Sequence, residues 1–165
     1  METADQEPVQ VVDQKPILFW IEDRRDTVTT QISIVREAQL PYKMYGTPSE
    51  LMAALEDVPQ IKSLCKGFLI DVMLFGVADL RSIGIYDAPT RNGVHAGYVF
   101  VDRVLRAKQS EFADKPVCFL TERQLDTAFM QDVENLRTRG GGRIEVVQKY
   151  KDSELEKFRK FLAEL

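Results

Sequence analysis

Five polar residues at the ends of short apolar runs could together carry out chemistry on a phosphoryl group. They are Glu22 and Asp23 after ILFWI (17–21), Asp71 ending KGFLID (66–71), Thr121 ending KPVCFLT (115–121) and Lys149 after RIEVVQ (143–148). Three carboxylates held close together repel one another, so their clustering favours a bound cation. Oxygen ligands favour a hard ion, and Mg²⁺ is the better choice because it also pairs with phosphate oxygens. A lysine charge and a threonine hydroxyl suit the phosphate itself.

The elements that must bring these residues together are strands buried on both faces. The four runs lack the polar alternation of a half-exposed strand, and YKMYG (42–46) reads as a weaker strand. Helical patterns separate the strands, and they fall at Val28–Val35, 47–57, Val94–Leu105, Leu125–Leu136 and 152–165. Five strands alternating with five helices predict an α/β fold, a parallel sheet with helices on both faces. Ligands bind beyond the carboxyl ends of such strands, where the five polar residues stand.

Residues that begin or end a helix are clear at one helix start and at one helix end. Thr47 is a suitable N-cap, Pro48 occupies the first helical position and Glu50 completes a capping box. The glycines at 140–142 end the helix that precedes the last strand. Residues 72–92 show no regular pattern and are predicted to be a long loop beside the site, of the kind that is functional or disordered.

Length and composition bound the possible function. A chain of 165 residues with 44% hydrophobic residues fits one domain, predicted at 15–165, with residues 1–14 as a disordered lead-in. No apolar run is long enough to cross a membrane, and the polar N-terminus is no secretory signal, so a cytoplasmic location is expected. The net charge of −4 argues against direct binding of nucleic acid.

The cysteine and histidine content excludes several kinds of site. Cys65 and Cys118 have no CxxC spacing and no companion histidines, so they predict neither a disulfide framework nor a zinc site. They read as two buried thiols of a reducing compartment. His95 is the only histidine, which excludes mechanisms that need several.

The order of acidic pair, central aspartate, threonine and lysine, each at a strand end, resembles the receiver domains of two-component response regulators. The similarity runs from about Pro16 to Leu165, nearly the whole chain. It implies a flavodoxin-like three-layer fold with strand order 2-1-3-4-5.

The resemblance also implies a role for each residue of the site. Asp71 matches the phosphorylated aspartate, and Thr121 and Lys149 match the switch hydroxyl and the lysine that contacts the phosphoryl group. The implied ligands of Mg²⁺ are Glu22, Asp23, Asp71 and the backbone carbonyl of Met73. A chain of this kind takes its phosphoryl group from a histidine kinase or a histidine phosphotransfer protein and catalyses its own phosphorylation and slow dephosphorylation.

The chain departs from the family pattern on both sides of the site. No proline follows Asp71 closely, and the loop that starts there reaches Gly93, which aligns with the glycine that normally ends a much shorter loop. Tyr150 replaces the proline that usually follows the lysine with a cis peptide bond, which predicts a trans or strained linkage.

Two further departures concern the switch. Glu122 stands after Thr121 where a small residue is common, and this carboxylate could hinder a phosphoryl donor or shape its access. The aromatic residue that often couples the hydroxyl to the fifth strand falls near Val146, so the usual relay is doubtful here.

Output is expected to pass through protein contacts with a downstream target, unless the chain is part of a longer protein. The fourteen N-terminal residues are too few for a DNA-binding module, and homodimerisation is left open.

Three other readings compete. The first is a pseudo-receiver, the same fold acting as an interaction or dimerisation scaffold without phosphorylation. A phosphatase with an aspartyl nucleophile generally needs a second acid two residues further on, where this chain has Met73. A flavin- or nucleotide-binding domain is disfavoured because the first strand leads to EDRRD rather than a glycine-rich turn, and the glycines at 140–142 precede a strand.

Overall fold

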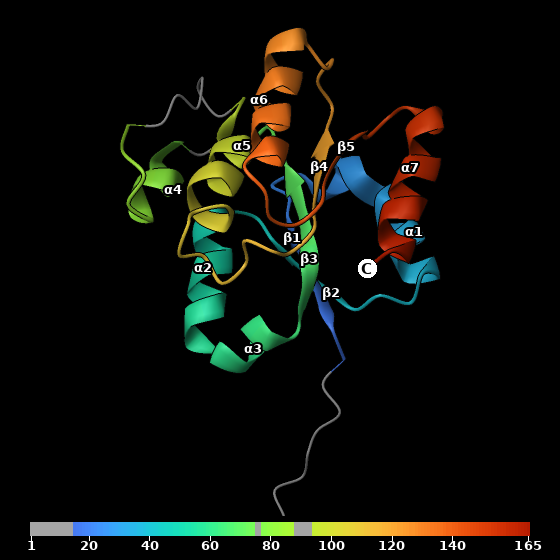
Figure 1. Ribbon diagram of the computed structural model, residues 1–165. Helices are drawn as coiled ribbons and strands as arrows, with labels where there is room; N and C mark the ends of the chain where they lie inside the picture. Colours follow the sequence, from blue (N-terminus) through green and yellow to red (C-terminus); the bar gives the residue numbers. More distant parts are fainter. Residues whose placement is uncertain (1–14, 75–76, 88–93) are drawn as a thin grey trace, which may run out of the picture.

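A five-stranded parallel sheet lies between two helical layers in the computed structural model, which describes residues 15–74, 77–87 and 94–165 (Figure 1). The strands are β1 (Ile17–Ile21), β2 (Tyr42–Tyr45), β3 (Cys65–Asp71), β4 (Val117–Thr121) and β5 (Ile144–Gln148). They are arranged in the order β2-β1-β3-β4-β5, and every neighbouring pair is parallel. The predicted fold class and strand order are therefore confirmed, and the carboxyl ends of all five strands lie at one edge.

The helices divide unequally between the two faces (Figure 1). One face is covered by α1 (Thr29–Glu37), which the 3-10 turn η1 (Arg25–Val28) precedes, and by α7 (Asp152–Ala163). The other is covered by α2 (Pro48–Asp57), α3 (Pro59–Ser63), α4 (Val77–Ser82), α5 (Ala96–Phe100) with its π-helical continuation η2 (Val101–Leu105), and α6 (Thr127–Thr138).

The strands are apolar throughout because each face has its own core. Along β3, Phe68 and Ile70 pack under α2, α5 and α6, whereas Leu69 packs under α1 and α7. Side chains of a strand alternate between faces, so burial on both sides requires an unbroken apolar run. This alternation also sends Asp71 toward the same side as Leu69.

The start of α2 follows the sequence pattern. Thr47 Oγ1 accepts a hydrogen bond from the N–H of Glu50 (3.2 Å), with Pro48 at the first helical position. Glu50 Oε2 accepts a hydrogen bond from the N–H of Gly46 (2.7 Å), one residue before the N-cap. The predicted N-cap at Thr47 is confirmed, whereas Glu50 bonds the N–H of Gly46 and not that of Thr47, as a capping box would require.

Two short helices differ from the sequence prediction. α3 was not expected, and α4 lies inside segment 72–92, which the sequence predicts to be a loop. Among the side chains that the structure describes, Ile61 of α3 and Leu80 of α4 lie in the core. Helices of five and six residues are too short to show helical periodicity in a sequence, so both elements depend on tertiary packing.

Other predictions fall on parts of the chain outside the described residues. They are the lead-in at 1–14 and the loop-ending position of Gly93. In the part of the chain that the structure describes, no helix has the length and apolar character needed to span a membrane.

Helix α5 approaches the end of β3 closely at Gly97. Its N–H donates to the carbonyl of Val72 (3.0 Å), and a Cβ at this position would overlap the carbonyl oxygen of Asp71. Only a residue without a side chain allows the helix to rest here. The contact therefore fixes the backbone of Asp71.

We expect Gly97→Ala to lower the free energy of unfolding by about 1–3 kcal/mol, because either the helix or the end of β3 must shift. Urea denaturation measures the loss. Gly46→Ala is the control, since its Cβ would meet only the flexible Glu50 side chain, at 3.4 Å. Equal stability of the two variants would contradict this close packing.

Candidate functional site

Lys149 lies at the centre of a buried polar cluster at the carboxyl edge of the sheet. Its Nζ atom is 2.7 Å from Oε2 of Glu22 and 2.9 Å from Oδ2 of Asp71. All three side chains are buried. The residues follow β1, end β3 and follow β5, as predicted, and the structure brings them into direct contact.

Two buried polar residues that the sequence reasoning missed hold Lys149 in place. Gln31 Nε2 donates to the backbone carbonyl of Lys149 (2.8 Å), and Lys149 Nζ donates to Thr27 Oγ1 (3.3 Å). The Thr27 hydroxyl in turn donates to the carbonyl of Arg24 (2.8 Å). The available signal was a polar residue at 31, on the same helical face as the apolar residues Val28 and Val35.

The acidic residues form a group that fits a divalent cation. One ligand oxygen from each of Glu22, Asp23 and Asp71 lies within 4.8 Å of the other two. Oxygens that share one Mg²⁺ at about 2.1 Å lie within about 4.2 Å of each other, so small side-chain movements would suffice.

Backbone groups orient two of these acids. The N–H of Arg24 donates to Glu22 Oε1 (3.0 Å), and the N–H of Met73 donates to Asp71 Oδ1 (3.0 Å). Met73 therefore adjoins the predicted metal site, whereas the role of its carbonyl stays a prediction. Asp23 is exposed, on the solvent side of the group.

The electrostatics of the cluster keep a positive charge next to two acids of raised pKa. Burial raises the pKa of Glu22 to about 7, repulsion from Asp71 adds to this, and Lys149 opposes it. Burial also raises the pKa of Asp71, although the charge of the nearby Lys149 lowers it in part. Burial alone lowers the pKa of Lys149, but the facing Asp71 and Glu22 outweigh it, so its pKa is raised and the ammonium stays charged.

Thr121 is buried at the end of β4, and its position on the neighbouring strand agrees with the prediction. The hydrogen bonds of the described residues join its hydroxyl oxygen to the N–H of Arg123 (3.1 Å) rather than to Asp71. Val146 lies in the core under α6, on the same side of the sheet as Phe119. Among the described residues, no hydrogen bond joins the Thr121 hydroxyl to the acids around Lys149.

Two residues that depart from the family pattern, Tyr150 and Glu122, contact each other beside Lys149. Tyr150 Oη donates to Glu122 Oε1 (3.2 Å), and this carboxylate oxygen is 3.9 Å from Lys149 Nζ. The peptide bond between Lys149 and Tyr150 is trans, and the lysine nevertheless points at Asp71.

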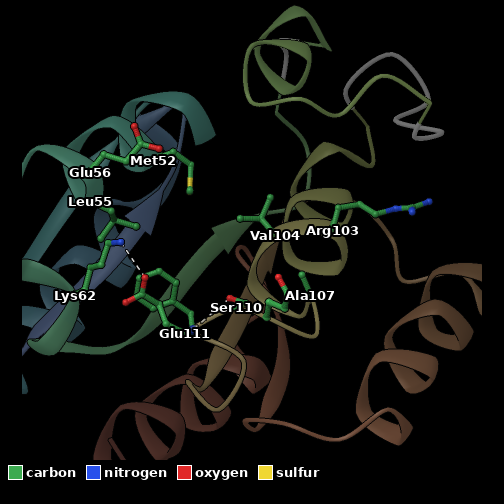
Figure 2. Close-up of a pocket in the computed structure, with 11 residues that line it drawn as sticks. Met52, Leu55, Glu56, Lys62, Arg103, Val104, Ala107, Ser110 and Glu111 are labelled. Atoms are coloured by element: carbon green, nitrogen blue, oxygen red, sulfur yellow. Dashed lines mark hydrogen bonds and ion pairs between the residues drawn. The ribbon is translucent and has the colours of Figure 1, made fainter. Parts of the chain in front are cut away.

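A separate pocket of about 360 Å³ lies between α2 and η2 (Figure 2). Met52, Leu55 and Val104 contribute its apolar wall, and the ion pair between Lys62 and Glu111 (2.9 Å) lies at one end. None of the acids around Lys149 lines it, so the charged cluster and this hollow are different features.

Comparisons with known proteins identify the fold. Three similar solved structures are a two-component response regulator from Legionella pneumophila, a candidate response regulator from Chloroflexus aurantiacus J-10-fl and a response regulator receiver protein from Burkholderia phymatum. Their TM-scores are 0.58, 0.58 and 0.56, with identities of 17%, 16% and 16%. The matches cover 92%, 91% and 90% of this chain and 100%, 99% and 96% of those chains.

No protein-family model and no curated protein matches the sequence. At the identities found among solved structures, the likeness establishes the fold and not the activity. The chain has the receiver fold of response regulators, and the acidic group of Glu22, Asp23 and Asp71 lies at the carboxyl edge of its sheet.

Proposed function

We propose that this chain is a phospho-accepting receiver of a two-component phosphorelay, with Asp71 as the acceptor. The observation that carries the proposal is the contact of Lys149 Nζ with Asp71 Oδ2 (2.9 Å), beside two further acids at the carboxyl edge. A lysine that only balanced buried charge would not require Asp23, which is exposed next to the same acids. A metal and a phosphoryl group account for all of these side chains together.

The transfer requires Asp71 as a carboxylate. One of its oxygens attacks phosphorus, the bond from phosphorus to the donor nitrogen of a phosphohistidine breaks, and the imidazole keeps that electron pair and takes up a proton. The product is an acyl phosphate on Asp71, and attack of water at phosphorus later releases inorganic phosphate. In such transfers the protein contributes mainly by positioning the reacting groups and by stabilising the charge of the transferring phosphoryl group.

The chain supplies groups for each part of this reaction. Glu22, Asp23, Asp71 and the carbonyl of Met73 would hold Mg²⁺, which when bound offsets the negative charge of the transferring group. The ammonium of Lys149 remains charged and close to Asp71, so it can contact a phosphoryl oxygen. Thr121 would turn its hydroxyl toward the phosphoryl group and shift the α6, β5 and α7 surface between two states.

Partners follow from this chemistry. The donor would be a histidine kinase or a histidine phosphotransfer protein, and the output a downstream protein target, with homodimerisation as a further possibility. Direct contact with nucleic acid is not part of the proposal, in keeping with the net charge of −4.

We expect acetyl phosphate with Mg²⁺ to add one phosphoryl group to the wild-type protein, seen as a gain in intact mass. Asp71→Asn should abolish the gain, because the amide is not a nucleophile here. Asp57→Asn, at an exposed acid at the end of α2, is the matched control and should leave the gain unchanged. An equal gain on Asp71→Asn, or none on the wild type, would contradict the proposal.

A scaffold without phosphorylation is the second candidate, and one observation favours it. Lys149 already pairs with both Glu22 and Asp71, at 2.7 and 2.9 Å, so part of their negative charge is balanced without a metal. Mg²⁺ titration followed by the fluorescence of Trp20, buried two residues before Glu22, separates the two functions. A saturable change supports the phospho-acceptor, and a flat titration supports the scaffold.

A further inference from the structure

Lys149 has a third carboxylate neighbour that the proposed reaction does not use. Besides Glu22 and Asp71, Glu122 places Oε1 at 3.9 Å from Nζ. Glu22 and Asp71 are buried, but the Glu122 side chain is 29% exposed. Glu122 is therefore the carboxylate around Lys149 that can leave at the smallest cost in packing.

Two groups from different segments hold Glu122 against the lysine. Tyr150 Oη donates to Oε1 (3.2 Å), and Arg24 Nη1 lies 4.0 Å from Oε2. Tyr150 is 67% exposed, high for a large aromatic residue, and its hydroxyl bonds the partly exposed carboxylate of Glu122. The hydroxyl and the carboxylate together form a latch across the outer side of Lys149, which we call the Glu122–Tyr150 latch.

The charges around the site make this latch an obstacle to a phosphoryl group. The carboxylates of Glu22, Asp23, Asp71 and Glu122 gather about two cations, Lys149 and Arg24. A phosphoryl donor brings further negative charge to the same place. Like charges at about 4 Å repel by about 1–4 kcal/mol near a protein surface, which is enough to change a rate about tenfold.

We propose that the Glu122–Tyr150 latch restrains phosphorylation of Asp71, because the Glu122 carboxylate competes with phosphoryl oxygens for Lys149. The proposal rests on the phospho-acceptor function given above and deepens it. Opening the latch moves Glu122 outward into solvent and frees the outer side of the ammonium. Glu122 is a positioning residue in this scheme, since it acts on the reaction through Lys149.

The test compares initial rates of phosphorylation by acetyl phosphate with Mg²⁺ in the wild type, Glu122→Gln and Tyr150→Phe. We expect Glu122→Gln to be about tenfold faster than the wild type at low salt. Tyr150→Phe, which removes only the hydroxyl, should be intermediate. Glu134→Gln, at an exposed acid on α6, is the matched control and should match the wild type.

Salt dependence separates electrostatic competition from a structural effect. The advantage of Glu122→Gln should shrink as ionic strength rises, because Glu122 is partly exposed and its charge is screened. It should also be larger with acetyl phosphate than with the less negative phosphoramidate. A thermal unfolding midpoint close to that of the wild type confirms that each variant is folded.

The outcomes distinguish this inference from the proposed function. Phosphorylation of the wild type at the same rate as both variants, or faster, overturns the latch alone. Absence of phosphorylation in every protein overturns the phospho-acceptor function and the latch with it. Phosphorylation of the wild type that is detectable but slower than that of both variants supports the phospho-acceptor function and the latch together.

Discussion

Replacing Lys149 by methionine should lower the free energy of unfolding by about 3–5 kcal/mol at about pH 8 without divalent cations. Methionine keeps the unbranched stem but removes the charge that lies 2.7 Å from Glu22 and 2.9 Å from Asp71. The two buried carboxylates then face each other without a cation. Removal of one member of a buried charge cluster is costly because the remaining charges are left desolvated.

The loss should depend on pH in a way that identifies its cause. Lys149 holds down the pKa of Glu22, so without it the acid takes up a proton more readily and relieves the repulsion. The difference from the wild type should therefore be smaller at about pH 5 than at about pH 8. Glu22→Gln in the Lys149→Met background should restore part of the stability, and this double-mutant cycle measures the coupling.

Urea denaturation at both pH values checks these expectations. Lys62→Met is the matched control, because Lys62 pairs with Glu111 at 2.9 Å on the surface, where such a pair contributes about 1 kcal/mol or less. A loss for Lys149→Met as small as that of the control at about pH 8 would show that the acids of the cluster are solvated and would contradict the buried cluster.

The wild-type protein without divalent cations should lose about 3 kcal/mol of stability between about pH 5 and pH 8 through Glu22. Burial, together with repulsion from Asp71, raises the pKa of Glu22 from 4.5 to about 7. Because the folded protein holds this proton more tightly than the unfolded chain does, its contribution to stability is full below about pH 4.5. The contribution is lost as the pH rises through about 7.

Denaturation across this pH range should show a flatter profile for Glu22→Gln than for the wild type, since the amide has no proton to lose. Glu56→Gln, at an exposed position on α2, should keep the wild-type profile. A wild-type profile parallel to that of Glu22→Gln would contradict the raised pKa.

The affinity for Mg²⁺ should rise with pH, whereas the stability of the metal-free protein should fall. A metal ligand must be deprotonated, so the affinity should rise by up to about tenfold per pH unit until Glu22 is ionised at about pH 7. The fluorescence of buried Trp20 reports the titration. An affinity that does not change over this range would mean that Glu22 is not a ligand.

Much of the fold is readable from the sequence because local pattern and tertiary role coincide. Runs such as ILFWI and KGFLID are apolar without alternation, which only strands covered on both faces require. Thr47 and Glu50 mark the start of α2 because capping is a local interaction. The short helices α3 and α4 escaped prediction because five and six residues are too few to show helical periodicity.

The sequence by itself determined the sheet, its strand order through the resemblance, and the polar residues at the strand ends. Only the tertiary structure decided their partners. Gln31 and Thr27 support Lys149 across separations of 118 and 122 residues, and no local pattern encodes such contacts. The meeting of Glu122 with Tyr150 likewise depends on where β4 and β5 end side by side. Periodicity indicates which face of an element is buried. Contacts between the ends of separate strands form only when the chain folds, so periodicity does not predict them.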